Sequence, residues 1–204
     1  MSDFLERLTE ALASHRPARV RVPDAREAAV LIPIVAVPEP TLIFTRRTDT
    51  VGSHKGQISF PGGSIDPEDP NMRCTALRET EEEIGLDPDA VSIIGELDTF
   101  PTFVSGYVVT PYVGWLAEEP DLRPNPAEVE SVLQVPIAAL SNEIRRDAGF
   151  EHGGRVYPTE AWVWEDNVIW GVTARVVRQF LDILAAADLV ERPDGDFNWY
   201  LPPT

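Results

Sequence analysis

The chain has 204 residues, of which 43% are hydrophobic and 25% are charged, and this is enough to close one hydrophobic core as a single domain. Its formal net charge of −17 argues against a partner that is nucleic acid or an anionic membrane, because both require a basic protein surface. Cys74 is the only cysteine, so no disulfide can form within the chain, and a reducing cytoplasm is the expected compartment.

The first predicted element is an amphipathic helix. Its apolar residues recur at helical spacing, at Phe4, Leu5, Leu8, Ala11 and Leu12. The segment has acids where a signal peptide would have basic residues, and the longest apolar stretch, AAVLIPIVAVP, is too short to cross a bilayer. We therefore expect a soluble protein in which residues 1–27 form an N-terminal helix and an irregular arm.

Strands are predicted next at residues 28–37 and 41–47, and Pro33 inside the first suits a sheet edge or a bulge. A glycine-rich loop with a short strand at 57–60 follows. Later strands are predicted at 91–100, at 107–116 and in a stretch that ends near Trp170, before a final helix that carries Val172, Val176, Phe180 and Leu184 on one side. Helices before, between and after strands indicate a layered α/β arrangement around a mixed sheet.

A helix rich in acids is predicted between Asp69 and Gly85. Asp69 followed by Pro70 favours a helix start with Asp69 as the N-cap, and Gly85 favours a helix end. The residues expected to face the core are Ala76, Leu77, Thr80 and Ile84.

Glu79, Glu82 and Glu83 share a neighbouring face of this helix. Like charges at this spacing repel by roughly 0.2–0.5 kcal/mol per pair, so a compensating charge is expected. Three carboxylates after a glycine turn form an all-oxygen ligand set suited to Mg²⁺ or Mn²⁺, with Arg78 able to orient one of them. The alternative is an acidic face that only keeps the protein solvated, as expected for Glu81. An EF-hand is excluded because residues 66–77 lack the glycine at the sixth loop position.

The stretch GGSIDPEDPNMRCTALRETEEEIGL resembles the Nudix box, G-x5-E-x7-R-E-U-x-E-E-x-G-U, where U is aliphatic. The second half of the pattern is matched by Arg78, Glu79, Glu82, Glu83, Gly85 and Leu86. The first half departs from it, since Asp69 stands near the position where the family usually has Glu. Thr80 also replaces an aliphatic residue.

Two further stretches narrow the resemblance to the coenzyme A pyrophosphatase branch. LIFTRRTDTVGSHKGQISFPGG is similar to that branch's second signature, and YPTEAWVWEDNVIWGVTARVV resembles its usual ending. The resemblance implies a Nudix-type α/β/α sandwich with a central mixed β-sheet over residues 28–190, followed by a tail at 191–204. It also implies hydrolysis of coenzyme A to 4′-phosphopantetheine and adenosine 3′,5′-bisphosphate.

The resemblance assigns roles to particular residues. Mg²⁺ or Mn²⁺ would be held by Glu79, Glu82 and Glu83, with a backbone carbonyl of Gly62 or Gly63 as a further ligand. The general base in this superfamily is often a glutamate after the box or one within it, such as Glu82. Glu128 is our candidate and Glu130 the fallback; an ordinary exposed glutamate at a helix start is the alternative for Glu128.

Cationic residues before the box, Arg46, His54 and Lys55, could bind the substrate phosphates, although each is also explained as a surface residue. Trp162, Trp164 and Trp170 are expected to pack the sheet, with stacking on adenine as the alternative. The substrate could instead be ADP-ribose, a reduced dinucleotide or a dinucleoside polyphosphate. A non-catalytic Nudix domain that binds a nucleotide is the third interpretation, and relatives often form homodimers.

Overall fold

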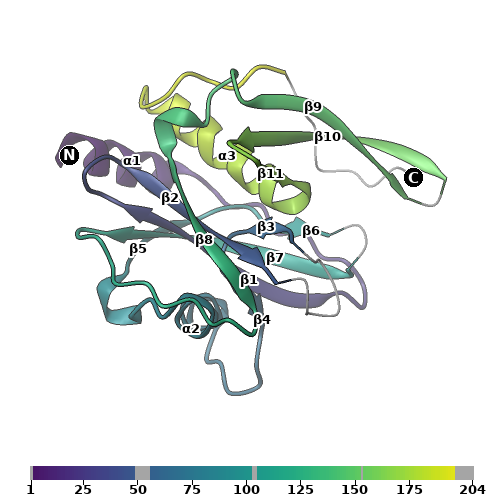
Figure 1. Cartoon of the computed structure of the whole chain (residues 1–204), viewed down its shortest axis with the longest axis horizontal. Helices are drawn as coiled ribbons and strands as arrows, with labels where there is room; N and C mark the ends of the chain where they lie inside the picture. Colours follow the sequence, from purple (N-terminus) through teal and green to yellow (C-terminus); the bar gives the residue numbers. More distant parts are fainter. Residues whose placement is uncertain (1, 49–55, 103–104, 153, 196–204) are drawn as a thin grey trace.

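The computed structural model is an α/β/α sandwich (Figure 1), and it describes residues 2–48, 56–102, 105–152 and 154–195. The helices are α1 (Ser2–Ser14), α2 (Met72–Ile84) and α3 (Gly171–Ala186), with short 3₁₀ helices η1 (Pro88–Ala90) and η2 (Ile137–Ala139). The strands are β1 (Arg26–Val35), β2 (Thr41–Arg47), β3 (Ile58–Ser59), β4 (Gly62–Ser64), β5 (Ser92–Glu96), β6 (Phe100–Pro101), β7 (Tyr107–Leu116), β8 (Val129–Pro136), β9 (Arg145–His152), β10 (Arg155–Trp164) and β11 (Asn167–Trp170). The expected α/β/α architecture with a central mixed sheet is confirmed.

The large sheet is mixed and has the strand order β3-β2-β1-β7-β5. β1 and β7 run parallel, whereas β2, β4 and β5 join as antiparallel neighbours. Pro33 lies in the central strand β1, not at a sheet edge as predicted from the sequence. It is tolerated there because β4 pairs with β1 only as far as Val30 and β2 pairs from Ile34, so the missing N–H falls between the two partners.

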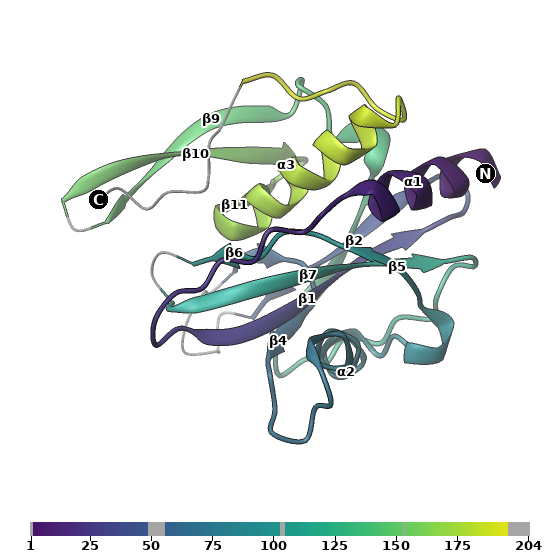
Figure 2. The ribbon, with the colours of Figure 1, turned by 180° about the vertical axis from the view of Figure 1, so that it is seen from behind.

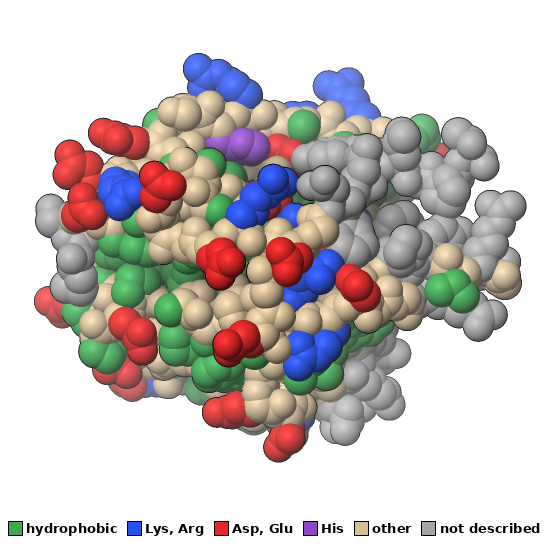
Figure 3. Space-filling view, turned by 90° about the horizontal axis from the view of Figure 1, so that it is seen from above, with side chains coloured by type: hydrophobic (Ala, Val, Ile, Leu, Met, Phe, Trp, Pro, Cys, Tyr) green, Lys and Arg blue, Asp and Glu red, His purple; other side chains and the backbone are tan. Residues whose placement is uncertain are grey.

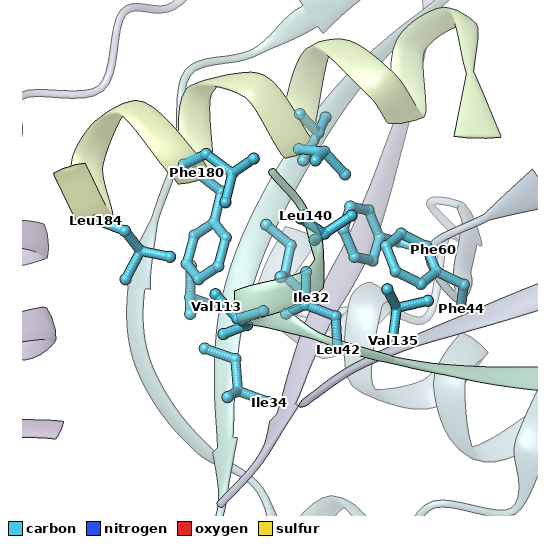
Figure 4. Packing of buried hydrophobic residues seen from close by; sticks show 14 of the residues in the cluster. Ile32, Ile34, Leu42, Phe44, Phe60, Val113, Val135, Leu140, Phe180 and Leu184 are labelled. Carbon is cyan, nitrogen blue, oxygen red and sulfur yellow. The ribbon is translucent and has the colours of Figure 1, made fainter. Parts of the chain in front are cut away.

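Side chains of β1 alternate between two hydrophobic layers. Leu31 and Val35 pack on the face covered by α2. Ile32 and Ile34 face the opposite layer, where α1, α3 and a three-stranded sheet, β11-β10-β9, cover the large sheet (Figure 2). Figure 4 shows Phe180 and Leu184 of α3 pointing into this second layer. Because both faces of β1 are covered, the strand reads as a nearly continuous apolar run.

Residues 91–100 do not form the single strand expected from their sequence. β5 ends at Glu96, and Asp98 and Thr99 turn to bind the N-terminal arm. Asp98 Oδ1 accepts a hydrogen bond from Ala18 N at 2.8 Å, and Thr99 N donates to Ala18 O at 3.0 Å. The polar side chains therefore interrupt the strand to fix the arm.

The stretch that ends near Trp170 is also divided. Residues 155–170 form the hairpin of β10 and β11, which turns at Glu165 with a φ of 52°. β8 and β9 are further strands that the sequence pattern did not reveal. In the described parts of the chain, no helix is long and apolar enough to span a bilayer.

Candidate active site

The helix that carries the box glutamates begins later than the sequence suggested. α2 starts at Met72, and its N-cap is Asn71, whose Oδ1 accepts a hydrogen bond from Cys74 N at 3.1 Å. The prediction of Asp69 as N-cap is therefore wrong. Asp69 turns inward instead, where its carboxylate accepts a hydrogen bond from Thr75 Oγ1 at 2.9 Å and binds Arg78. The predicted end is confirmed, because Gly85 adopts a left-handed φ of 69°.

Arg78 connects the segment before α2 with the glutamates on that helix. Its Nε and Nη2 donate to the two carboxylate oxygens of Asp69 at 3.0 and 2.8 Å. Its Nη1 donates to Glu79 Oε1 at 3.0 Å and to Glu82 Oε2 at 3.1 Å. The guanidinium thus binds three carboxylates at once through three of its nitrogens, which a lysine could not reproduce. The predicted pairing of Arg78 with box glutamates is confirmed.

Glu79 is held against the backbone of the glycine turn. A Cβ added at Gly63 would overlap Glu79 Oε2, so only glycine allows this approach. Burial raises the pKa of Glu79, Arg78 partly offsets the effect, and the charges of Glu82 and Glu128 raise it further.

Glu83 is the most shielded glutamate of the box, with 3% of the residue exposed. Its Oε2 accepts a hydrogen bond from Gly62 N at 3.3 Å, and its Oε1 lies 3.7 Å from Arg47 Nη1. Burial raises the pKa of Glu83 to about 7, against the opposing effects of Gly62 N–H and Arg47. Repulsion from Glu79 and Glu128 adds to the increase.

Glu128 joins the same acidic group although it lies far along the chain. It precedes β8, so the alternative of a glutamate at a helix start is wrong. Its negative charge raises the pKa of both Glu79 and Glu83, so it interacts electrostatically with these two carboxylates of the box. Glu130, the fallback, is exposed on the strand beyond the buried Val129.

The two arginines of β2 separate to opposite faces of the sheet. Arg47 reaches Glu83 on the α2 face, whereas Arg46 Nη2 donates to Asn167 Oδ1 of β11 on the other face. Sequence reasoning selected Arg46 and missed Arg47. The signal that could have found Arg47 is the alternation of a strand, since Ile43 packs on the α2 face and Arg47 shares its parity.

Some of the remaining predicted residues lie among those that the structure describes, and others lie outside them. His54 and Lys55 lie outside the described residues. Trp162 is fully buried and Trp164 packs against the core as expected, but Trp170 is 40% exposed and does not fit that expectation. Glu81 is exposed, as predicted.

The carboxylate oxygens of the box are ligands of the kind that a divalent cation binds. The guanidinium groups of Arg78 and Arg47 face four carboxylates, those of Asp69, Glu79, Glu82 and Glu83, so two negative charges remain unbalanced. Carboxylate oxygens are the donors that Mg²⁺ and Mn²⁺ prefer. No group of three or more His, Cys, Asp or Glu side chains in the described residues is already arranged to hold a metal ion.

Comparison with known proteins places this geometry in a family. The model of the NUDIX domain matches residues 25–158. The uncharacterized Nudix hydrolase NudL of Photorhabdus laumondii is 39% identical over 181 residues, which cover 88% of this chain and 95% of that protein. NudL of Yersinia enterocolitica is 39% identical over 186 residues, which cover 88% of this chain and 90% of that protein.

A solved structure supports the fold alone. The MutT/nudix family protein from Enterococcus faecalis aligns with a TM-score of 0.53 and 14% identity, over 89% of this chain and 69% of that chain. The sandwich, the glycine turn and the carboxylate helix together define an enzyme that hydrolyses pyrophosphate bonds. The chain belongs to the Nudix family, whose members bind nucleotide substrates and typically depend on divalent metal ions.

Proposed function

We propose that this Nudix pyrophosphohydrolase cleaves coenzyme A and its derivatives, giving 4′-phosphopantetheine and adenosine 3′,5′-bisphosphate. The observation that carries the proposal is how the segments that resemble the coenzyme A pyrophosphatase branch meet. Arg47 of the Thr-x-Arg strand lies on Glu83 of the box, and Arg46 beside it binds Asn167 of the C-terminal segment. The three segments, distant in sequence, are thus joined through β2, with the Arg47–Glu83 contact on the α2 face of the sheet and the Arg46–Asn167 contact on the other face.

The box glutamates Glu79, Glu82 and Glu83 would hold Mg²⁺ or Mn²⁺, and a carbonyl of Gly62 is the proposed backbone ligand. When bound, such ions neutralise the pyrophosphate charge, lower the pKa of a water molecule and stabilise the leaving phosphate. Arg78 keeps Glu79 and Glu82 oriented through its hydrogen bonds. Gly62 N–H and Arg47 do the same for Glu83.

Glu128 is the proposed general base. Hydrolysis forms a bond between the water oxygen and one phosphorus, and breaks the bond from that phosphorus to the bridging oxygen, which leaves with the other phosphate. A Glu128 carboxylate oxygen would accept the proton that the water loses.

The substrate's remaining charge is proposed to lie against cationic residues in the segment of the sequence before the box. These are Arg46, His54 and Lys55, and Arg47 joins them on the evidence of its contact with Glu83. Arg46 is held by a neutral amide at Asn167, so that contact does not cancel its positive charge.

Product analysis tests the proposal. Purified protein with Mg²⁺ or Mn²⁺ is incubated separately with coenzyme A, ADP-ribose and reduced NAD. Fastest release of adenosine 3′,5′-bisphosphate from coenzyme A is expected. A preference for ADP-ribose or reduced NAD would keep the site and overturn the substrate, and no hydrolysis of any compound would favour a domain that only binds nucleotides.

The metal-ligand assignment is tested on the same helix. Glu83→Gln is expected to lower turnover by about 100-fold or more, because it removes a buried ligand carboxylate. Glu81→Gln is the matched control, because Glu81 is exposed on α2 and should leave turnover unchanged. Full Mg²⁺-dependent turnover in Glu83→Gln would contradict the assignment.

A further inference from the structure

We propose that Asn125 is a positioning residue that holds Glu128 at the box carboxylates; the inference rests on the proposed role of Glu128 as general base. Asn125 lies in the loop between β7 and β8, within the sequence Pro124-Asn125-Pro126-Ala127-Glu128. Three sets of backbone contacts connect this loop to the site.

The first set attaches the loop to the end of the box helix. Asn125 N donates to the carbonyl of Glu83 at 2.8 Å, and Arg123 N donates to the carbonyl of Ile84 at 2.7 Å. The last carbonyls of a helix have no partner within the helix, so these contacts satisfy groups that would otherwise need water. The loop is thereby fixed to the turn that carries Glu83.

The second set makes the turn that leads to Glu128. Asn125 Oδ1 accepts a hydrogen bond from Ala127 N at 3.1 Å, which is an Asx turn. The carbonyl of Asn125 accepts from Glu128 N at 3.0 Å and from Val129 N at 2.8 Å. Asn125 therefore accepts hydrogen bonds from three successive backbone N–H groups, those of residues 127–129. Pro126 adds stiffness, because the residue before a proline is restricted to extended backbone.

The third set closes the segment onto β2. The carbonyl of Glu128 accepts a hydrogen bond from Thr48 N at 3.0 Å, and Val129 pairs with Arg47 in the sheet. The backbone of Glu128 is thus held between α2 and the end of β2, and its charge acts on Glu79 and Glu83. Because these three charges repel one another, Glu128 would move outward unless its backbone were restrained.

The first experiment compares two Asx turns. Asn125→Ala removes the side-chain acceptor of the turn before Glu128 and leaves the two hydrogen bonds to the backbone carbonyl. Asp87→Ala removes a turn of the same kind after the box helix, where Asp87 Oδ1 accepts from Asp89 N at 2.9 Å. With coenzyme A and Mg²⁺, Asn125→Ala is expected to lower kcat by about 10- to 100-fold with little change in KM, because a small misplacement of a catalytic group has this effect. Asp87→Ala should leave both constants unchanged.

A second readout needs neither substrate nor metal. Hydrogen exchange of the amides of Ala127, Glu128 and Val129 should accelerate in Asn125→Ala, while the thermal unfolding midpoint stays close to that of the wild type. Asn125→Asp keeps the acceptor oxygen and should restore the slow exchange. Unchanged exchange in Asn125→Ala would overturn the inference.

A double-mutant comparison separates this inference from the proposed function. If Asn125 acts through Glu128, Asn125→Ala should add no further loss of kcat to Glu128→Gln. Full turnover in Glu128→Gln would reject Glu128 as the base, and the inference would fall with it. An inactive Glu128→Gln beside a fully active Asn125→Ala would reject only the inference. If coenzyme A is not cleaved, the preferred compound from the product analysis replaces it as the probe.

Discussion

Gly63 determines how close a metal-ligand candidate can lie to the backbone. An added methyl group would overlap the carboxylate of Glu79, which is the movable end of a side chain. Gly63→Ala should therefore leave the fold intact but displace Glu79, and weaken Mn²⁺ binding by about 10-fold or more. Titration with Mn²⁺ followed by electron paramagnetic resonance measures the affinity, and thermal unfolding reports the fold.

Ser64→Ala serves as the comparison, because Ser64 is an exposed neighbour on the same strand. Its Mn²⁺ affinity should equal that of the wild type. Unchanged affinity in Gly63→Ala would show that the position of Glu79 against the turn is not needed for metal binding.

Asp69 makes stability depend on pH. The hydrogen bonds from Arg78, followed by a backbone hydrogen bond involving Asp66, hold the pKa of Asp69 well below its usual range. Between the pKa of Asp69 in the unfolded chain, about 4, and its lower pKa in the folded chain, the unfolded chain binds a proton that the folded chain does not bind. Stability is therefore lost as pH falls from about 4 toward the folded-state pKa. The contribution is fully present above about pH 4.

Asp69→Asn is accordingly expected to lower the free energy of unfolding by about 2 kcal/mol at pH 7, because it removes charged hydrogen bonds. The difference from the wild type should shrink as pH falls from about 4 toward 2. Urea unfolding at pH 7, 5 and 3 measures it, with the exposed Asp89→Asn as the control. A difference that is equal at pH 3 and 7 would argue against the ionised pair.

Local patterns predicted the box carboxylates and Arg78, but not the role of Asp69 or the contact of Arg47. Glu79, Glu82, Glu83 and Arg78 are neighbours on one helix, so their spacing is sufficient to place them together. The sequence suggested Asp69 as the N-cap, but the Asp69 carboxylate binds the guanidinium of Arg78 on α2 instead. Asn71 caps the helix in its place. Arg47 meets Glu83 only after β2 and α2 pack, which no local pattern encodes.

At the scale of elements, one buried glutamate, paired with two arginines, joins the three-stranded sheet to α3. Glu160 of β10 is fully buried, and its Oε1 accepts from Arg145 Nε and from Arg178 Nη1, each at 2.7 Å. Arg178 also donates to the carbonyls of Pro193 and Asp194, at 3.2 and 3.0 Å. The described start of the C-terminal tail is therefore fixed to α3.

Glu160→Gln is expected to lower the free energy of unfolding by about 3 kcal/mol, because it leaves two guanidinium groups shielded from water without their shared charge partner. Asp147→Asn removes the other acidic partner of Arg145. Because the side chain of Asp147 is 79% exposed, this substitution should change the free energy of unfolding by less than about 0.5 kcal/mol. Urea unfolding compares the two variants. Equal effects would mean that burial of the pair does not matter.

The same contacts explain why β9 was not predicted. Its sequence, RRDAGFEH, has no apolar alternation, and it becomes a strand through pairing with β10 from Arg145↔Trp162 to His152↔Arg155. β1, β2 and β7 were found because burial imposes an apolar pattern on each of them. Pairing between distant segments leaves no such mark when a strand is mostly exposed.

For the whole molecule, charge and packing act differently. Acidic and basic side chains are interspersed on the face seen in Figure 3, so the net charge of −17 is not concentrated in one patch of that face.

Packing, by contrast, connects the N-terminus to the rest of the chain. Leu8 is fully buried in the cluster that contains Phe180 and Leu184 of α3, and Phe4 stacks on Trp115 of β7 with ring centroids 6.2 Å apart.

This packing predicts that the N-terminal helix and the sandwich unfold together. Leu8→Ala should lower the free energy of unfolding by about 3 kcal/mol, through lost burial and an unfilled cavity. Tryptophan fluorescence and circular dichroism should still report one shared transition, because α1 and the sheet use the same core. Glu10→Ala changes an exposed residue of the same helix and should have almost no effect. Two separate transitions in Leu8→Ala would instead show that residues 1–27 form an independent element, and turnover would then survive melting of the helix.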